Sequence, residues 1–199
     1  MGLIGNLTYN VFMFPFEKAV LHSFRKDSVS GASGNVLEIG VGTGVNSRYL
    51  NEEKIESLTV IDTTIRKPVM ISMKKRFGEF NFLEGSVEKL PFTDRSFDTI
   101  VFTLVFCSVA DPAKGLLEIK RVLKDNGELI FIEHVKPEGK KIRNIVEKVN
   151  PYWNSFSNGC NINRETLSAI KSAGFEIQEN SYKRKGVFIT GTARKALRF

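Results

Sequence analysis

The sequence is poor in cysteine and lacks long apolar runs. Its 199 residues include two cysteines, Cys107 and Cys160, which lie far apart and belong to no paired motif. This argues against a disulfide framework and against a zinc site. No stretch approaches the roughly 18 consecutive apolar residues of a spanning helix, and the N-terminus has no signal-peptide pattern. We therefore expect a reducing, cytoplasmic setting.

Acidic residues are scarce near the C-terminus. Residues 183–198 hold six basic side chains and no acidic one, and the whole chain has a formal net charge of +7. Such an excess of positive charge attracts phosphates or anionic lipid head groups. The same composition is typical of a solvated face. Peripheral contact with a membrane and simple exposure to solvent are therefore two alternatives. No aromatic-rich RNA-binding motif accompanies the charge. The lack of such a motif makes nucleic acid an unfavoured partner.

Repeats and low-complexity tracts are absent as well. With 42% hydrophobic and 26% charged residues, the composition is that of an ordinary globular protein. A chain of this length suits one domain, here residues 1–199, and can bury a proper core. The oligomeric state is not encoded in these features.

Apolar segments of strand length alternate with segments of helical period. Strands are expected at 36–39, 57–61, 80–83, 96–103 and 127–135, and helices at 5–26, 44–52, 66–77 and 111–124. Pro68 is expected to interrupt its helix early, and Asn126 with Gly127 to form a turn. The alternation predicts an α/β fold, a mostly parallel sheet with helices on both faces.

The C-terminal part breaks this alternation. Residues 174–182 and 186–194 predict two strands that are separated only by the short segment 183–185. A parallel crossover needs a much longer connection. We therefore expect an antiparallel hairpin at one end of the sheet.

A glycine-rich turn follows the first expected strand. The stretch NVLEIGVGTGVN places glycines at Gly40, Gly42 and Gly44. Glycines let the backbone approach a ligand closely, although such turns also serve packing alone. The spacing G-x-G-x-G differs from the dinucleotide fingerprint G-x-G-x-x-G, whose third glycine would fall on Val45. The turn indicates a nucleotide-like ligand without identifying it.

Two carboxylates accompany the turn. Glu38 is a charged residue inside a buried strand, which is costly unless it is hydrogen-bonded. Asp62 ends the second strand, where a carboxylate can accept both hydroxyls of a ribose. Segments 85–92 and 103–109 follow the third and fourth strands. All four lie at the carboxyl edge of the expected sheet, where open α/β folds bind ligands.

Together these segments resemble the class I S-adenosylmethionine-dependent methyltransferases. LEIGVGTG is similar to the family's first motif, LPFTDRSFDTIV to its run into the fourth strand, and VLKDNGELIFIEH to its turn and fifth strand. The resemblance covers residues 30–195. It implies a Rossmann-like, seven-stranded, mostly parallel sheet with an antiparallel C-terminal strand. It also implies S-adenosylmethionine as cofactor and S-adenosylhomocysteine as product.

A narrower resemblance concerns the methyl acceptor. Residues 101–109, 133–135 and 150–170 are similar to the thiol S-methyltransferases and their small prokaryotic relatives. Phospholipid and quinone methyltransferases share much of the remaining pattern. The resemblance therefore implies a small or lipophilic acceptor, a thiol first and a phospholipid or quinone head group second. A non-catalytic module that only binds S-adenosylmethionine is a further alternative.

The resemblance also assigns residues to the cofactor. The three glycines would lie against its methionine part, and Asn46 would help to hold the carboxylate, unless Asn46 only caps a helix or lies on the surface. Asp62 would bind the ribose. The full expected set is Glu38, Gly40, Gly42, Gly44, Asn46, Asp62, Thr63, Ser86, Val87, Thr103 and Leu104.

The adenine side departs from the family pattern. Ser86 stands where relatives commonly have an acidic residue facing adenine N6, followed by a small apolar residue, here Val87. A serine hydroxyl accepts a hydrogen bond without charge, so a weaker contact is expected there. Glu88 is either an alternative acceptor or a surface residue. Thr63 is expected beside the adenosine.

Methyl transfer is an in-line displacement, in which a protein mainly aligns the partners and excludes water. Thr103 and Leu104 are expected beside the reacting methyl group. A base is optional, because a thiol with a pKa of about 8.5 is partly ionised near neutrality. His134, at the end of the fifth strand, is the candidate catalytic base, or else an orienting residue. Both cysteines are expected to be buried and without a catalytic role.

Two helical lid segments, 1–30 and 137–165, are expected to cover the acceptor pocket. Their side chains imply a rather apolar substrate, or else they pack the lids onto the sheet. The expected substrate contacts are Tyr9, Phe12, Phe16, Trp153 and Asn161. No metal ligands are expected.

The second lid segment carries an apolar stripe. Ile142, Ile145, Val146 and Val149 recur at helical spacing, and lysine and arginine residues flank them. The pattern is typical of a helix that lies on a membrane surface or over an apolar substrate. It is also typical of a helix packed on its own domain.

Overall fold

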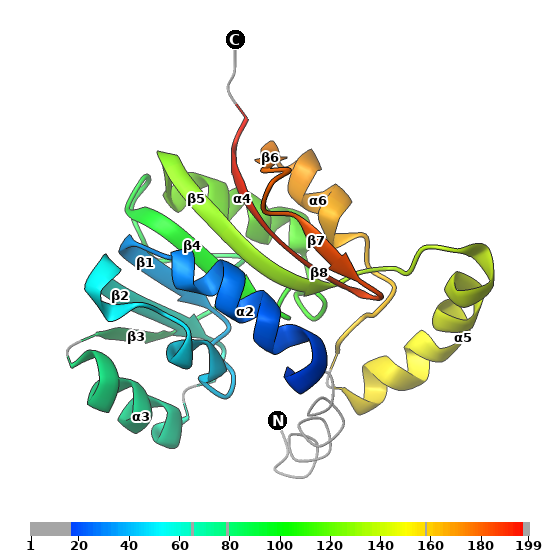
Figure 1. The fold of residues 1–199 in the computed structure, drawn as a ribbon, viewed down its shortest axis with the longest axis horizontal. Helices are drawn as coiled ribbons and strands as arrows, with labels where there is room; N and C mark the ends of the chain where they lie inside the picture. Colours follow the sequence, from blue (N-terminus) through cyan, green and yellow to red (C-terminus); the bar gives the residue numbers. More distant parts are fainter. Residues whose placement is uncertain (1–16, 65, 79, 158, 197–199) are drawn as a thin grey trace.

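A computed structural model describes residues 17–64, 66–78, 80–157 and 159–196, which form one mixed sheet with helices around it (Figure 1). Its elements are, in chain order, η1 (Glu17–Leu21), α2 (His22–Ser28), η2 (Val29–Gly31), β1 (Gly34–Ile39), η3 (Val45–Arg48), η4 (Glu52–Lys54), β2 (Ile55–Asp62), α3 (Lys67–Phe77), β3 (Asn81–Glu84), β4 (Phe97–Thr103), α4 (Pro112–Val122), β5 (Leu123–His134), α5 (Lys140–Phe156), α6 (Thr166–Ser172), β6 (Phe175–Ile177), β7 (Lys183–Lys185) and β8 (Phe188–Lys195).

The sheet has the order β3-β2-β1-β4-β5-β8-β6, and β7 pairs with β8. Neighbours from β3 to β5 pair in parallel, whereas β8 is antiparallel to β5 and β6. This confirms the mostly parallel Rossmann-like sheet with an antiparallel C-terminal strand. The strand order reverses between β1 and β4, and open α/β sheets bind ligands beside such a point. The glycine turn leaves β1 there.

Alternate residues of each strand face opposite sides of the sheet. Leu37 of β1 belongs to the core that includes α4 and α6, whereas Val36 belongs to the core that includes α2 and α3. Helices on both faces are thereby confirmed. By the same alternation Glu38 follows Val36 to the α2 side. In β4, Val101 lies in the α2 core, so Thr103 points to that side too.

Helix α4 illustrates how local sequence sets an element. Pro112 occupies its first turn, where the missing N–H costs nothing, and the side chain of Asp111 accepts from a backbone N–H of that turn at 3.0 Å. Leu116, Ile119 and Val122 recur at helical spacing and are fully buried. Each such burial stabilises the fold by about 1.5–3 kcal/mol.

Local predictions are corrected at four places. Pro68 lies in the first turn of α3 and does not interrupt it. The helix expected at 44–52 is the short 3₁₀ turn η3, because Asn51 leaves helical geometry and caps η4 instead. Asn126 and Gly127 lie within β5 at a register shift against β4 rather than in a turn.

The fourth correction concerns segment 183–185, which was expected to connect two strands. It forms the eighth strand, β7, and turns into β8 through Gly186 at φ +62°. Residues 174–182 contribute only β6, which pairs with the C-terminal end of β8, whereas β7 pairs with its N-terminal end.

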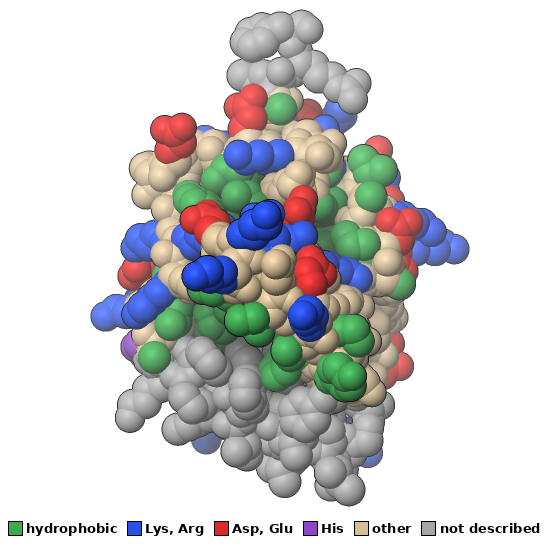
Figure 2. Space-filling view, turned by 90° about the vertical axis from the view of Figure 1, so that its right-hand side faces the viewer, with side chains coloured by type: hydrophobic (Ala, Val, Ile, Leu, Met, Phe, Trp, Pro, Cys, Tyr) green, Lys and Arg blue, Asp and Glu red, His purple; other side chains and the backbone are tan. Residues whose placement is uncertain are grey.

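Helix α5 extends away from the sheet at the right of Figure 1. Three residues of the expected apolar stripe are exposed to solvent on this helix: Ile142 at 56%, Ile145 at 61% and Val149 at 45%. Figure 2 looks at the molecule from the side on which α5 lies, and shows lysine and arginine side chains interspersed with hydrophobic ones. Within the described residues no helix is long and apolar enough to cross a membrane.

Candidate active site

The glycine turn is a tight backbone loop at the carboxyl end of β1. Gly40 and Gly44 have φ of +71° and +75°, a region that favours glycine. A Cβ at Gly40 would overlap the side chain of Val105, and one at Gly44 would stand 2.9 Å from Val69. These two glycines therefore let the turn pack against its neighbours. A Cβ at Gly42 would meet no atom within 4 Å, so the backbone of Gly42 is the part of the turn that is open to a ligand.

Asp62 is joined to this turn directly. Its Oδ2 accepts from the backbone N–H of Gly42 at 2.9 Å, and its Oδ1 accepts from the N–H of Thr64 at 3.2 Å. Thr63, which is exposed, donates weakly to Oδ1 at 3.4 Å. A carboxylate has more acceptor capacity than these bonds use. The structure thus brings the two expected parts of the cofactor site together.

A buried polar network lies beneath the turn. Asn46 donates through Nδ2 to Glu38 at 2.8 Å and to the Thr103 hydroxyl at 3.1 Å. Arg25 of α2 donates to the side-chain oxygen Oδ1 of Asn46 and to Thr103 Oγ1, the latter at 2.9 Å. All four residues are at most 9% exposed. Asn46 is therefore neither a surface residue nor a simple cap, because its amide links β1, β4 and α2.

Glu38 keeps one unused acceptor in this network. Its Oε2 is buried and has no hydrogen-bond partner among the described residues. Burial raises the pKa of Glu38 to about 7, against the opposing effects of Asn46 and Arg25, while the charge of Asp62 adds to the increase. A buried unpaired oxygen is costly, so this atom suits a cationic group of a ligand.

The segment expected at the adenine is tied by its own side chains. The Ser86 hydroxyl accepts from the backbone N–H of Glu88 at 3.2 Å and donates to its carboxylate at 3.3 Å. The other oxygen of Glu88 accepts from the N–H of Asp111 at 2.7 Å. Val87 is buried in the core with α4. Glu88 is thus a residue that holds two loops together.

The end of β4 combines strain with a buried acid. Leu104 has φ +55°, which costs a non-glycine residue on the order of 1–3 kcal/mol. The next two N–H groups, of Val105 and Phe106, donate to Oε1 of Glu133 at 2.7 and 2.8 Å. Glu133 is fully buried, which raises its pKa to about 8. This acid therefore fixes the loop that begins at Leu104.

His134 meets both cysteines. One atom each of Cys107, His134 and Cys160 lie within 4.8 Å of one another, and all three residues are buried. Nδ1 of His134 is 3.8 Å from the sulfur of Cys160, and its ring packs on Phe188 with 4.6 Å between centroids. Hydrogen bonding from Cys107, and then from His134 and Trp153, lowers the pKa of Cys160. The sequence contained no motif for this cluster.

Asn161 joins the second lid segment to the sheet. Its backbone N–H and its side-chain amide both donate to the carbonyl oxygen of Cys107, at 2.8 and 3.2 Å. Its own amide oxygen accepts from Asn150 and Asn154 of α5. Asn161 therefore positions Cys160, its neighbour in the chain, opposite Cys107.

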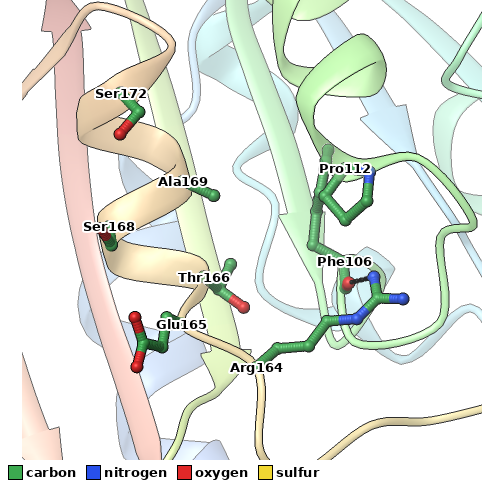
Figure 3. Close-up of a pocket in the computed structure, with 8 residues that line it drawn as sticks. All are labelled: Phe106, Pro112, Arg164, Glu165, Thr166, Ser168, Ala169 and Ser172. Atoms are coloured by element: carbon green, nitrogen blue, oxygen red, sulfur yellow. Dashed lines mark hydrogen bonds between the residues drawn. The ribbon is translucent and has the colours of Figure 1, made fainter.

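A surface pocket of about 450 Å³ lies beside this cluster, between α6 and the loop after β4 (Figure 3). Arg164 lines this pocket and donates to the carbonyl oxygens of Phe106 and Val109 at 2.5 and 2.6 Å. None of the residues expected to bind cofactor or substrate lines it. It borders the candidate site without belonging to it.

Three expected substrate contacts, Tyr9, Phe12 and Phe16, lie outside the described residues. Sequence reasoning missed Arg25 and Glu133 altogether. Arg25 is a charged residue that is buried beside Phe24 in α2. Glu133 is an acidic residue within an apolar strand. A charge inside a buried element is the signal that identifies both residues, as it does Glu38.

Comparisons with known proteins bear on this geometry. The family model described as a methyltransferase domain matches residues 37–131. Thiol S-methyltransferase TMT1B of Mus musculus is 35% identical over 172 residues, which is 81% of this chain and 69% of that protein. Demethylmenaquinone methyltransferase of Thermotoga maritima is 33% identical over 106 residues, 53% of this chain and 46% of that protein.

The fold is also similar to solved structures. The YcgJ protein of Bacillus subtilis matches with a TM-score of 0.69 at 18% identity, over 89% of this chain and 98% of that one. At this identity the similarity concerns the fold alone.

Proposed function

Because this chain belongs to the S-adenosylmethionine-dependent methyltransferase family, we propose that it transfers the methyl group of that cofactor to a small thiol. One observation carries the proposal most directly. The hydrogen bond from Gly42 N–H to Asp62 joins the glycine turn and the ribose carboxylate into one cradle at the switch point of the sheet.

The residues present fit the cofactor. We assign the unpaired Oε2 of Glu38 to the positive charge of the methionine part, since a buried carboxylate oxygen needs such a partner. The open space at Gly42 admits a ligand against the turn. Asp62 retains acceptor capacity for two ribose hydroxyls. We also assign Thr63, Ser86 and Val87 to the adenosine part of the cofactor. When bound, the cofactor supplies an electrophilic methyl group on a sulfonium.

Thr103 and Leu104 are proposed to border the reacting atoms. Arg25 and Asn46 hold the Thr103 hydroxyl, and Glu133 holds the loop that follows Leu104. Fixed side chains at this edge would align the acceptor with the methyl group, which is the main contribution a protein makes to such a displacement.

A thiol is the acceptor that the surroundings favour. TMT1B, the thiol S-methyltransferase of Mus musculus, is similar over most of this chain, which supports this acceptor class. Two cysteine sulfurs and the His134 imidazole form a buried cluster, and the sulfur of Cys107 contacts the carbonyl oxygen of Leu104. A thiol needs little help to ionise near neutrality. Since Nδ1 of His134 faces Cys160, we propose the orienting role for His134 rather than that of a base.

The test is methyl transfer from isotopically labelled S-adenosylmethionine to a panel of acceptors. The panel holds a small alkyl thiol, a hydroquinone and phosphatidylethanolamine vesicles, and mass spectrometry follows products. We expect a labelled thioether and an equal amount of S-adenosylhomocysteine. Transfer to the hydroquinone or the lipid alone would contradict the thiol assignment. Cofactor binding without turnover on any acceptor would favour a binding module.

We further propose that α5 contacts an anionic membrane surface. Ile142, Ile145 and Val149 leave an apolar strip exposed along the helix, with Lys141 and Lys148 also exposed on it. Such a basic amphipathic helix binds at the lipid interface through apolar burial and charge together. A lipophilic thiol could then reach the site from the membrane.

A further inference from the structure

We propose that Cys107, His134 and Cys160 form a zinc site with one open coordination position, and that the acceptor thiol binds the ion there as a thiolate. The inference rests on the proposed function, because it takes a thiol as the acceptor. In this proposal His134 orients the reactants by binding the zinc ion through a ring nitrogen.

The three ligand atoms already converge. The two sulfurs and a ring nitrogen of His134 lie within 4.8 Å of one another. A tetrahedral zinc ion, with Zn–S of about 2.3 Å and Zn–N of about 2.0 Å, holds such atoms about 3.5–3.8 Å apart. The sulfur of Cys160 and Nδ1 of His134 are 3.8 Å apart. Closing on an ion thus requires only small side-chain movements.

Three separate elements hold the ligands in place. Cys107 lies in the loop after β4, His134 ends β5, and Cys160 follows α5. The hydrogen bonds from Asn161 to the Cys107 carbonyl oxygen tie residues 159–165, the lid loop between α5 and α6, to the loop after β4. The ring of His134 packs on Phe188. Metal sites depend on such support, because it sets the ligand geometry before the ion arrives.

The donor set selects the ion and leaves one coordination position without a protein ligand. Two thiolates and an imidazole suit zinc and do not suit hard cations such as Mg²⁺ or Ca²⁺. Among the described residues no carboxylate oxygen joins the three ligand atoms within the same span. A four-coordinate ion would therefore keep one position for an outside ligand, as catalytic zinc sites with two cysteines and one histidine do.

The cluster also lies where the reaction is expected. Cys107 Sγ is 3.5 Å from the carbonyl oxygen of Leu104, the residue proposed to border the methyl group. All three ligand residues are at most 3% exposed, so the bound sulfur would be shielded from water. Strained Leu104 and the zinc ligands would thus belong to one acceptor site.

The chemistry balances without a further reactant. The incoming thiol loses its proton to solvent on binding, because a thiol that coordinates a metal ion is deprotonated. A lone pair of the zinc-bound sulfur then attacks the methyl carbon, so a new sulfur–carbon bond forms as the old bond to the sulfonium breaks. The two products are a neutral thioether and S-adenosylhomocysteine. A neutral thioether binds zinc weakly and leaves the ion.

Cobalt substitution tests the site without any turnover. Reduced, metal-free protein of the full chain is titrated with Co²⁺ alone, and its absorption spectrum is recorded. We expect one Co²⁺ per chain, with sulfur-to-cobalt charge-transfer bands and the intense visible bands of a tetrahedral ion. Since the chain has two cysteines, such charge-transfer bands must come from Cys107 and Cys160. No cobalt–sulfur band in the reduced, folded protein would overturn the site.

Matched variants locate the ligands. Zinc affinity, measured by competition with a chromogenic chelator, should fall in Cys160→Ser by more than the roughly 100-fold that loss of an outer-shell partner costs. His22→Gln removes the other histidine of the chain, whose Nδ1 contacts Tyr49, and should leave affinity unchanged. Equal affinity in wild type and Cys160→Ser would overturn the assignment. Circular dichroism checks that each variant is folded.

A second spectrum separates this inference from the proposed function. Adding a small alkyl thiol to the cobalt protein should change its visible bands, because the open position takes up the sulfur. An unchanged spectrum overturns the substrate-binding role of the metal. Thiol methylation at an undiminished rate by metal-free protein overturns the zinc inference and leaves the proposed function standing. A zinc-loaded protein that binds thiols but methylates only other acceptors contradicts the proposed function instead.

Discussion

The guanidinium of Arg25 donates to the side-chain oxygen of Asn46, so the helix α2 is bonded to the residue that follows the glycine turn. The same nitrogen reaches Thr103 at the end of β4, 78 positions along the chain. A charge from α2 thereby holds the carboxyl edges of β1 and β4 together. The cofactor cradle and the edge proposed to face the methyl group are parts of one bonded unit.

Arg25→Met should destabilise the protein by about 3 kcal/mol, because it leaves Glu38, Asn46 and Thr103 buried without their cationic partner. Urea unfolding measures the free energy of unfolding. Lys26→Met, at an exposed position of the same helix, is the matched control and should change it by less than about 0.5 kcal/mol. Equal effects of the two substitutions would show that the network contributes little.

Glu38 should make stability depend on pH. Its carboxyl has a pKa of about 7 in the folded protein against an ordinary value of 4.5, so the folded state retains a proton that the unfolded state releases. Stability should therefore fall as pH rises from 4.5 to 7, by on the order of 3 kcal/mol, and level off above. The difference between wild type and Glu38→Gln isolates this contribution, because other groups titrate in both.

The same residue should link cofactor binding to pH. Arg25 and Asp62 are the charged groups that act on Glu38, the first lowering and the second raising its pKa. Affinity for S-adenosylmethionine should rise as pH passes through about 7, because the carboxylate then forms beside a cationic ligand. Calorimetry at several pH values measures this. A slope that persists in Glu38→Gln would assign the titration to another group.

Asn161→Ala should loosen the lid loop. The variant loses the bonds from the amide to the Cys107 carbonyl and from Asn150 and Asn154. Since each of these three bonds contributes about 1 kcal/mol, hydrogen exchange across residues 159–165 should quicken by roughly 150-fold. Asn163→Ala is the control, because the Asn163 amide donates to the exposed carboxylate of Glu147 on α5 and does not contact Cys107. Unchanged exchange in Asn161→Ala would contradict the anchoring role.

The exposed face of α5 should bind anionic vesicles. Replacing Ile142 and Ile145 together by glutamate should reduce binding at least about 10-fold, because apolar burial is lost and negative charge is added. Ile71→Glu changes a similarly exposed isoleucine, 70% open on α3, and should bind as wild type does. Vesicle sedimentation measures both. Equal loss in the two variants would point to non-specific charge repulsion.

Much of the fold follows from local sequence. The glycine turn, Asp62 at the end of β2 and the closely spaced C-terminal strands each rest on residues that are near one another in the chain, and the structure bears out their placement. Segment 183–185 was missed because its pairing depends on β8 rather than on its own polar composition. Asn126 and Gly127 are residue types that favour turns, yet they lie within β5, where the register of pairing with β4 shifts.

The site depends more on distant packing. Nothing next to Arg25 in the sequence indicates that α2 brings its guanidinium to the side chain of Asn46. Cys107 and Cys160 are separated by α4, β5 and α5, and only the return of the lid loop to the end of β4 brings their sulfurs together. Single residues that meet across such distances leave no local pattern. Buried charge at Glu38, Glu133 and Arg25 was the signal that sequence offered.

Calorimetric titration with S-adenosylmethionine, comparing wild type with Asp62→Ala, tests the central claim most directly. Asp62 bonds the glycine turn and is proposed to bind the ribose, so its loss should weaken affinity at least about 100-fold. Glu56→Ala, an exposed acid on the same strand, should bind as wild type does. NAD should bind to none of the three proteins. Normal binding of S-adenosylmethionine by Asp62→Ala, or binding of NAD in its place, would contradict the account.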